Sequence, residues 1–465
     1  MPRLSPMEIY RKLPGINCKK CGVDTCMAFA SKLIERAATP DDCPPLDEEK
    51  YRKKKEDLIK LLAPPVKEVV IGAGEKTFKI GGEEVMYRHE LTYFNSTGLF
   101  YDVDCSMPAD ELIKRVKEIE GFGVEKIGKV LRFDGIAVRC KTGDATNFGE
   151  TVLTVSETST LPMVLCSYDP ELLEVGVGIA LDKRPLLYAA TPDNWEKVSD
   201  IAKRHSCPVV ASAPGDIQRL LELSRNLNAA GIEDIVLDIG TSPLGDGFAD
   251  TINNLAVLRR LAIEDQIPEA MYPLLGVPMV SWIGAENDID ATYEEATLAA
   301  SLLLRYCDIL ILHSTEVWSN LPLLTLRLNI YTDPRVPVSV ESKLYVVGKP
   351  NETAPVFLTT NFALTYFTVA SDLESAKIPS YILVADTEGL AVEVSMAGKK
   401  ITPDVIQEIF EKSKIEEKVK HKKLIIPGVS ARIKGEIEDA TGWEVIVGPK
   451  DSSQILGFIQ KNWNP

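Results

Sequence analysis

Four cysteines near the start of the chain have the spacing of a metal centre. They form the array Cys18-x2-Cys21-x4-Cys26-x16-Cys43 in a sequence of 465 residues. Four thiolates can close a tetrahedral site, which suits either an iron–sulfur cluster or a structural zinc ion. Zinc sites more often pair two Cys-x2-Cys units, and this array contains only one such unit.

The residues around the array favour the cluster. Gly22 follows Cys21 and Pro44 follows Cys43, so the backbone can turn closely around a bulky group. The nearest histidine in the sequence is His89, too remote to be an obvious fourth ligand. We therefore predict a [4Fe-4S] cluster on the four cysteines, with zinc or unliganded thiols as the alternatives.

A second group of candidate binding residues lies in the C-terminal part of the chain. Four segments rich in Thr, Ser and Gly each follow an apolar, strand-like run: 359–361 (TTN), 387–391 (TEGLA), 427–430 (PGVS) and 448–453 (GPKDSS). In an open α/β sheet, ligands bind outside the carboxyl ends of the strands. Such segments suit a large polar ligand, although the same residues are common in turns and helix caps. No G-x-G-x-x-G or P-loop pattern occurs, so no nucleotide is indicated.

The middle of the chain offers weaker candidates for catalysis. Its apolar runs end near Asp104, Arg139, Ser167, Thr191, Asp238, Trp282 and His313. Neither paired carboxylates, histidines at metal-binding spacing nor a nucleophile elbow can be recognised among them. Asp238 and His313 are either acid/base groups or structural groups that bind backbone amides.

These candidates require helices and strands that position them, and the middle of the chain shows a regular alternation of apolar runs and amphipathic segments. Apolar runs that read as strands occupy 98–104, 135–140, 162–167, 185–190, 208–213, 234–240, 278–284 and 308–314. Amphipathic helices are indicated at 108–122, 194–205, 216–231, 248–264 and 296–306, among others. Near-continuous apolar strands between helices are typical of a parallel sheet buried on both faces. Eight such units predict a closed (β/α)8 barrel, with an open doubly wound sheet as the alternative.

The pattern predicts three α/β parts. A cluster domain with a short charged linker helix covers 1–63 and ends at Pro64-Pro65; a β-hairpin cover and the barrel cover 64–320. Residues 321–340 carry three prolines and are predicted to be a linker. Residues 341–465 then form a smaller, open doubly wound α/β domain, with strands at 356–362, 380–386, 423–429 and 443–448 and helices at 403–415, 431–442 and 451–463.

Composition limits the partners and the compartment. The formal net charge of −16 argues against nucleic-acid binding. The start of the chain lacks the apolar core of a secretory signal, and no apolar run is long enough to span a membrane. The remaining cysteines, Cys105, Cys140, Cys166, Cys207 and Cys307, are isolated in the sequence, so we interpret them as small buried residues in a reducing, cytoplasmic compartment.

Long motifs at both ends resemble one known family. The segment EIYRKLPGINCKKCGVDTCMAFASKLIERAATPDDCPPL is similar to the cluster domain of the large (gamma) subunit of the corrinoid iron–sulfur protein, part of the acetyl-CoA decarbonylase/synthase system. The segments NIYTDPRVP, PVFLTTNFALTYF, KIPSYILVADTEGLAV, KLIIPGV and TGWEVIVGP resemble its corrinoid-binding domain. The barrel matches in layout, so the resemblance covers essentially the whole chain. MAFASKLIERA and GGEEVMYRHELTYFNSTGLFYDV are closer to the archaeal form than to the bacterial one.

The resemblance implies a methyl carrier. In that family a corrinoid, a cobalt-containing cobamide, accepts a methyl group from a methyl-tetrahydropterin at Co(I) and exchanges it with the metal site of acetyl-CoA synthase, while a [4Fe-4S] cluster reduces Co(II) to Co(I). The implied cluster ligands are Cys18, Cys21, Cys26 and Cys43. The implied corrinoid contacts are Thr359, Thr365, Gly389, Leu390, Ala391, Val392 and Ser452, with Gly428 and Gly448 shaping the loops. Implied partners are the small (delta) subunit in a heterodimer, the acetyl-CoA synthase subunit, and the methyl-tetrahydropterin or its methyltransferase.

Two other functional classes are compatible with the residues. One is a self-contained barrel enzyme that uses the cluster as an electron inlet. The other is a plain electron-transfer module whose last domain only docks partners. Corrinoid absorption bands in the purified protein would distinguish the methyl carrier from both.

Overall fold

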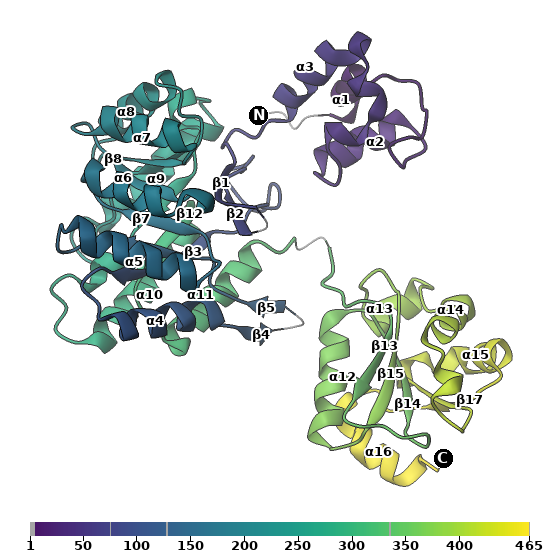
Figure 1. Cartoon of the computed structure of the whole chain (residues 1–465). Helices are drawn as coiled ribbons and strands as arrows, with labels where there is room; N and C mark the ends of the chain where they lie inside the picture. Colours follow the sequence, from purple (N-terminus) through teal and green to yellow (C-terminus); the bar gives the residue numbers. More distant parts are fainter. Residues whose placement is uncertain (1–4, 75, 127–128, 334–335, 465) are drawn as a thin grey trace. The chain divides into compact units, whose positions relative to one another are not determined.

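The chain divides into two compact units in the computed structural model (Figure 1). The structure describes residues 5–74, 76–126, 129–333 and 336–464. One unit runs up to Phe122 and includes Arg132–Thr332; the other joins Gly123–Leu131 to the chain from Asp333 onward. Within the described residues, no helix is long and apolar enough to cross a membrane.

The cysteine array lies in a small helical module. It consists of α1 (Pro6–Lys12), α2 (Cys26–Ile34), three 3-10 turns, η1 (Pro40–Asp42), η2 (Pro44–Asp47) and η3 (Glu49–Tyr51), and α3 (Arg52–Leu62). Ile9, Phe29 and Leu58 are buried together in its core. The sequence predicted α3 as a linker helix, but Leu58 packs in the module and Lys12 pairs with Asp57 at 2.8 Å. The helix is therefore a structural part of the module, because its apolar face is buried there.

Eight parallel strands form a closed barrel, as the sequence predicts. The strands in chain order are β3 (Gly98–Asp104), β6 (Gly135–Arg139), β7 (Met163–Cys166), β8 (Leu186–Ala190), β9 (Val209–Ser212), β10 (Ile235–Asp238), β11 (Leu274–Gly276) and β12 (Cys307–Leu312). The helices are α4 (Ala109–Gly121), α5 (Ala145–Thr158), α6 (Pro170–Ile179), α7 (Trp195–His205), α8 (Ile217–Ala229), α9 (Phe248–Ile263), α10 (Asp288–Leu304) and α11 (Val317–Ile330), with short turns η4 (Leu181–Lys183), η5 (Pro268–Ala270) and η6 (Pro278–Trp282).

A hairpin covers the end of the barrel where the strands begin. Its strands are β1 (Val69–Ala73) and β2 (Lys76–Ile80), which pair antiparallel. Val69 and Ile71 join the same buried cluster as the barrel residue Phe100, and Phe78 packs on Phe100 edge-to-face. The predicted hairpin cover is confirmed, and it leaves the opposite end, where the strands finish, available for a site.

One predicted strand is wrong. The apolar run 278–284 forms the 3-10 turn η6, and the seventh strand lies just before it at Leu274–Gly276. Pro278 has no N–H to donate to a neighbouring strand, and the N–H of Val277 binds the Thr241 hydroxyl at 2.9 Å. Apolar composition alone does not distinguish such a turn from a strand.

The predicted linker 321–340 is also corrected in its first half. Helix α11 continues to Ile330 and buries Leu323 and Leu324, so residues 321–330 belong to the barrel. Pro322 lies in the second turn of this helix, where it cannot donate the i→i−4 hydrogen bond, and the helix continues past it to Ile330. Within the rest of the predicted linker, residues 334–335 lie outside the described part of the chain.

The C-terminal domain is an open, doubly wound sheet, again as predicted. Its order is β13-β15-β14-β16-β17, with β13 antiparallel to the others. The strands are β13 (Leu344–Val347), β14 (Val356–Thr360), β15 (Ser380–Ala385), β16 (Lys423–Ile426) and β17 (Glu444–Val447). The helices are α12 (Ala363–Ser375), α13 (Val392–Ala397), α14 (Pro403–Ser413), α15 (Lys434–Thr441) and α16 (Ile455–Asn462), with turns η7 (Ile415–Glu417), η8 (Gly428–Ile433) and η9 (Ser452–Gln454).

Helices cover both faces of this sheet. Apolar residues of α13, α14 and α15 pack on one face, and residues of α12 and α16 pack on the other (Figure 1). The chain adds β15 on one side of β14 and then β16 and β17 on its other side. The strand order therefore reverses between β14 and β16, which is the place where open α/β sheets bind ligands. A separate antiparallel pair, β4 (Val124–Lys126) and β5 (Lys129–Leu131), belongs to the same unit.

Candidate functional site

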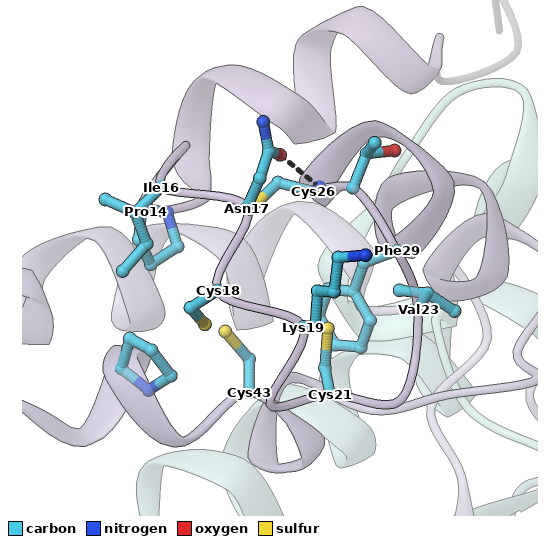
Figure 2. Close-up of a pocket in the computed structure, with 12 residues that line it drawn as sticks. Pro14, Ile16, Asn17, Cys18, Lys19, Cys21, Val23, Cys26, Phe29 and Cys43 are labelled. Atoms are coloured by element: carbon cyan, nitrogen blue, oxygen red, sulfur yellow. Dashed lines mark hydrogen bonds between the residues drawn. The ribbon is translucent and has the colours of Figure 1, made fainter.

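The four predicted cluster ligands line one pocket (Figure 2). Cys18 and Cys21 lie on the loop between α1 and α2, Cys26 is the first residue of α2, and Cys43 lies between η1 and η2. Cys26 and Cys43 are buried, whereas Cys18 and Cys21 are half-buried. Apolar side chains such as Val23 and Phe29 form much of the remaining lining, together with the polar residues Asn17, Lys19 and Thr25. The structure thus brings together all four residues that the sequence predicted.

Local hydrogen bonds and backbone conformation explain this convergence. The Asn17 side chain accepts a hydrogen bond from the Cys26 N–H at 2.8 Å, and the Thr25 hydroxyl caps α2 by accepting from the Ala28 N–H. The backbone of Asn17, Lys19 and Gly22 is left-handed, with φ values of 49°, 59° and 76°. These residues curl the loop so that its thiols face inward.

Four thiols that line one pocket suit a thiolate-bound metal group, either an iron–sulfur cluster or a single zinc ion. Burial, and to a smaller extent the other three cysteines, raise the pKa of Cys43 to about 11, although a backbone hydrogen bond from Leu46 lowers it. A metal group would reverse this effect, because a coordinated thiol is deprotonated.

The second candidate site lies at the carboxyl ends of β14 to β17, and Asn361 organises it. The Asn361 side-chain oxygen accepts from the Thr387 N–H at 3.0 Å, the Thr387 hydroxyl at 2.9 Å and the Gly389 N–H at 2.9 Å. Its amide nitrogen donates to Asp386 at 2.9 Å. One buried side chain therefore fixes the loop 386–391 that follows β15.

The residues predicted to contact the corrinoid come from three loops of this edge. Thr359 is the penultimate residue of β14, and Thr365 lies in the first turn of α12. Gly389, Leu390 and Ala391 lie in the loop after β15, Val392 begins α13, and Ser452 begins η9. Helix α12 contacts η9, which brings the first and last of these loops together. Gly389 has φ of 74°, and a side chain there would meet Pro337 at 3.0 Å, so this glycine shapes the loop rather than facing open space.

Several polar atoms at this edge lack partners. The hydroxyl oxygens of Thr359, Thr360 and Ser430 are buried and make no hydrogen bond within the described chain. Nearby, a side chain at Gly428 would lie 2.7 Å from the carbonyl oxygen of Gly448, so these two loops touch through their backbones. Since buried hydroxyls are normally hydrogen-bonded, a polar ligand or water is expected next to them.

The barrel has its own polar cluster where its strands end. Asp102, which the sequence did not single out, is buried and contacts His313 at 2.6 Å, Arg139 at 2.7 Å and Arg115 at 3.1 Å. Burial disfavours its charge, but His313 and the two arginines outweigh burial and lower the pKa of Asp102 to about 2. His313 also packs edge-to-face on Trp282, with ring centroids 4.4 Å apart. This cluster is an ion-pair network, which the sequence could not reveal because its members are remote in the chain.

Most other strand-end groups have structural partners. Asp238 accepts hydrogen bonds from the Tyr188 and Ser212 hydroxyls and the Gly240 N–H, each at 2.8 Å, and burial raises its pKa. Asp104 accepts from the Ser106 N–H at 3.0 Å, and Ser167 accepts from the Asp169 N–H at 3.0 Å. These contacts favour the structural reading of Asp238 over an acid/base role.

Comparison with known proteins agrees with the fold and the cysteine module. Residues 68–459 match the family described as "CO dehydrogenase/acetyl-CoA synthase delta subunit", and residues 13–45 match the family described as "Putative Fe-S cluster". The chain is 46% identical over 99% of both chains to acetyl-CoA decarbonylase/synthase complex subunit gamma 2 of Methanosarcina thermophila. It is 45% and 44% identical, over 99% of each chain, to the gamma subunits of Archaeoglobus fulgidus and Methanothermobacter thermautotrophicus.

Part of the chain also resembles solved structures. Dihydropteroate synthase from Thermus thermophilus matches with a TM-score of 0.38 and 16% identity, over 56% of this chain and 100% of that chain. This likeness carries no information about what the barrel binds. The identity over the full length does decide the family, and the N-terminal match agrees with the four-cysteine pocket. The chain therefore belongs to the family of acetyl-CoA decarbonylase/synthase complex gamma subunits, with an iron–sulfur domain at its N-terminus.

Proposed function

We propose that this chain is the corrinoid-carrying methyl carrier of such a complex, with a [4Fe-4S] cluster in its N-terminal module. The observation that carries the proposal is the presence, in one chain, of a four-thiol pocket and an open α/β edge with buried, unpartnered hydroxyls. When bound, the corrinoid would supply the cobalt that accepts and donates the methyl group, and the cluster would supply the electron that keeps the cobalt reduced.

The chain's own residues would hold and position these groups. Cys18, Cys21, Cys26 and Cys43 would ligate the cluster, and the module's apolar lining would exclude water from it. Low solvent exposure and hydrogen bonds to sulfur are the means by which a protein tunes the potential of such a cluster.

At the other site, the loop 386–391 would lie against the corrinoid. Leu390, Ala391 and Val392 would supply apolar contacts, and Thr359, Thr365 and Ser452 would supply hydroxyls. Asn361 would act as a positioning residue, because its bonds fix the loop without requiring it to touch the ligand.

The proposal includes partners and a compartment. The corrinoid would lie between the C-terminal domain and a small (delta) subunit, so the active species would be a heterodimer that binds the cofactor better than this chain alone. It would exchange methyl groups with an acetyl-CoA synthase subunit on one side and a methyl-tetrahydropterin, or its methyltransferase, on the other. The proposed location of the complex is the cytoplasm.

Anaerobic purification of the heterodimer tests the proposal. We expect about four irons and four sulfides per chain, together with one cobalt and corrinoid absorption bands that shift on reduction and methylation. Stoichiometric zinc would contradict the cluster. Turnover without corrinoid would instead indicate a barrel enzyme, and a cluster without cobalt would indicate an electron-transfer module.

A cysteine substitution separates the roles of the two cofactors. Cys26→Ala should abolish reductive reactivation of the corrinoid while leaving methyl transfer from prereduced protein largely intact. Cys207→Ala, a buried thiol in the barrel, is the matched control and should leave both activities unchanged. Loss of methyl transfer from prereduced Cys26→Ala protein would show that the cluster does more than supply electrons.

A further inference from the structure

Two of the cysteines outside the array lie side by side at the carboxyl ends of neighbouring barrel strands. Cys105 follows Asp104 of β3 and Cys140 follows Arg139 of β6, and Asp104 and Arg139 are register partners. The Cys105 N–H donates to the Arg139 carbonyl at 3.0 Å, and the two sulfur atoms lie 3.2 Å apart. Neighbouring strands are ~4.8 Å apart, within the Cα separation that a disulfide bond requires. The sequence predicted both cysteines as isolated buried residues, and the barrel register corrects that prediction.

The two thiols have different surroundings. Cys105 is buried, and its sulfur lies 3.4 Å from the Thr142 hydroxyl. Burial alone would raise the pKa of Cys105, but hydrogen bonds from Thr142, Cys140 and the adjacent backbone N–H groups outweigh burial and lower it. Cys140 is half-buried, and burial together with its bond to Cys105 raises its pKa. Such asymmetry gives one readily formed thiolate and one thiol that retains its proton.

The other barrel cysteines lack this arrangement. The Cys207 sulfur lies 3.6 Å from the His205 carbonyl oxygen, and burial raises the pKa of Cys207 to about 11. Burial raises the pKa of Cys166 to about 12. These thiols resemble inert core cysteines, so Cys207 provides a control within the same barrel.

We propose that Cys105 and Cys140 form a dithiol/disulfide couple on the carboxyl-end face of the barrel, oxidised by a low-molecular-weight disulfide. The Cys105 thiolate attacks one sulfur of the oxidant, forms a mixed disulfide and expels the first thiolate. Cys140 then loses its proton and attacks the Cys105 sulfur, which forms the Cys105–Cys140 bond and expels the second thiolate. In total, two protein thiols are oxidised and one small disulfide is reduced to two thiols.

The position of this couple indicates which segments a disulfide between Cys105 and Cys140 would hold together. Arg139, next to Cys140, pairs with the buried carboxylate of Asp102. A disulfide would tie the loop after β6 to the loop after β3, beside this ion-pair network. The inference stands on the barrel alone and does not depend on the proposed methyl-carrier function.

The test is an anaerobic titration of the full, cluster-containing chain with reduced and oxidised glutathione. Acid quenching, alkylation under denaturing conditions and peptide mapping then report which thiols are blocked. We expect two fewer alkylated thiols than the nine in the sequence, a bond mapped to Cys105 and Cys140, and full recovery on reduction. Cys140→Ser should stop at a mixed disulfide between Cys105 and glutathione.

Two further variants define the chemistry. Thr142→Val removes the exposed hydroxyl beside Cys105 and should slow formation of the mixed disulfide roughly two- to fivefold, as expected for one ordinary hydrogen bond. Cys207→Ser should behave like the unmodified chain. The inference is overturned if all nine thiols remain alkylatable in excess oxidised glutathione, if the bond joins other cysteines, or if Cys207→Ser prevents its formation.

Discussion

Replacing Asn361 with alanine should release the loop 386–391 of the C-terminal domain. The substitution removes the acceptor of two backbone N–H groups, those of Thr387 and Gly389. The Thr387 hydroxyl keeps an alternative acceptor, the Leu390 carbonyl at 3.0 Å. Each buried N–H left without an acceptor costs ~1–3 kcal/mol, so with partial relaxation we expect the loop to lose roughly 2–4 kcal/mol of local stability.

Asn351 offers a matched control in the same domain. Its side-chain oxygen accepts from the N–H and the hydroxyl of Thr353 at 3.0 and 2.9 Å, the same pattern that Asn361 makes with Thr387. Asn351 is exposed and precedes β14, at the opposite end of the strand from the candidate site. Water can replace its bonds, so Asn351→Ala should cost no more than ~1 kcal/mol.

Hydrogen exchange measured by mass spectrometry, combined with cobalt content, is the appropriate assay, because a chain of several domains has no single free energy of unfolding. Asn361→Ala should accelerate exchange in peptides that cover 386–391 by about two orders of magnitude and should lower cobalt per heterodimer. Unchanged exchange would refute the role of the hydrogen bonds. Faster exchange with full cobalt would show that this loop does not contact the corrinoid.

Further outcomes follow from other parts of the chain. Gly428→Ala should destabilise the C-terminal domain by ~1–3 kcal/mol in thermal melts, because the new side chain meets backbone atoms at 2.7 Å. Gly435→Ala is the matched control: its new side chain meets nothing within 4 Å, so the variant should be neutral or stabilising. Burial and Asp308 raise the pKa of the buried Glu83 carboxyl to about 8. The stability contributed by protonated Glu83 is therefore complete below the unfolded pKa of about 4.5 and is lost as pH rises through about 8. Thermal melts of Glu83→Gln at different pH values should lack this pH dependence. Limited proteolysis should cut first near Pro64–Pro65 and near residues 331–337, and a first cut within 98–314 would contradict this division.

The barrel could be predicted because its strands are buried on both faces. Runs such as GLFYDVD and DIVLDIG are mostly apolar, and amphipathic helices separate them at regular intervals. The same criterion, which takes an apolar run as a strand, failed for PMVSWIG: its composition is equally apolar, but its first residue is a proline. The strand β13 was missed for a different reason: its four residues, LYVV, are apolar, but it is a short edge strand that is mostly not buried.

The two candidate sites differ in how far the sequence could specify them. The cysteine ligands are close together in the chain, so their spacing alone predicts that they converge. The function of Asn361 depends on residues 26 and 28 positions away, brought near by the parallel register of β14 and β15. Local sequence reveals only that a polar residue follows the strand, and the partner loop becomes visible only when the sheet is assembled.

The pairing of Cys105 with Cys140 is a case of the same kind. Each cysteine ends an apolar run, and in isolation each reads as a small core residue. The alignment of Asp104 with Arg139 places both cysteines one residue past the end of adjacent strands, where side chains leave the packed interior and meet the loops. A parallel barrel repeats this geometry at every neighbouring pair of strands. Chemistry that requires two groups in contact can therefore be found at the strand ends even when the sequence separates them by 35 residues.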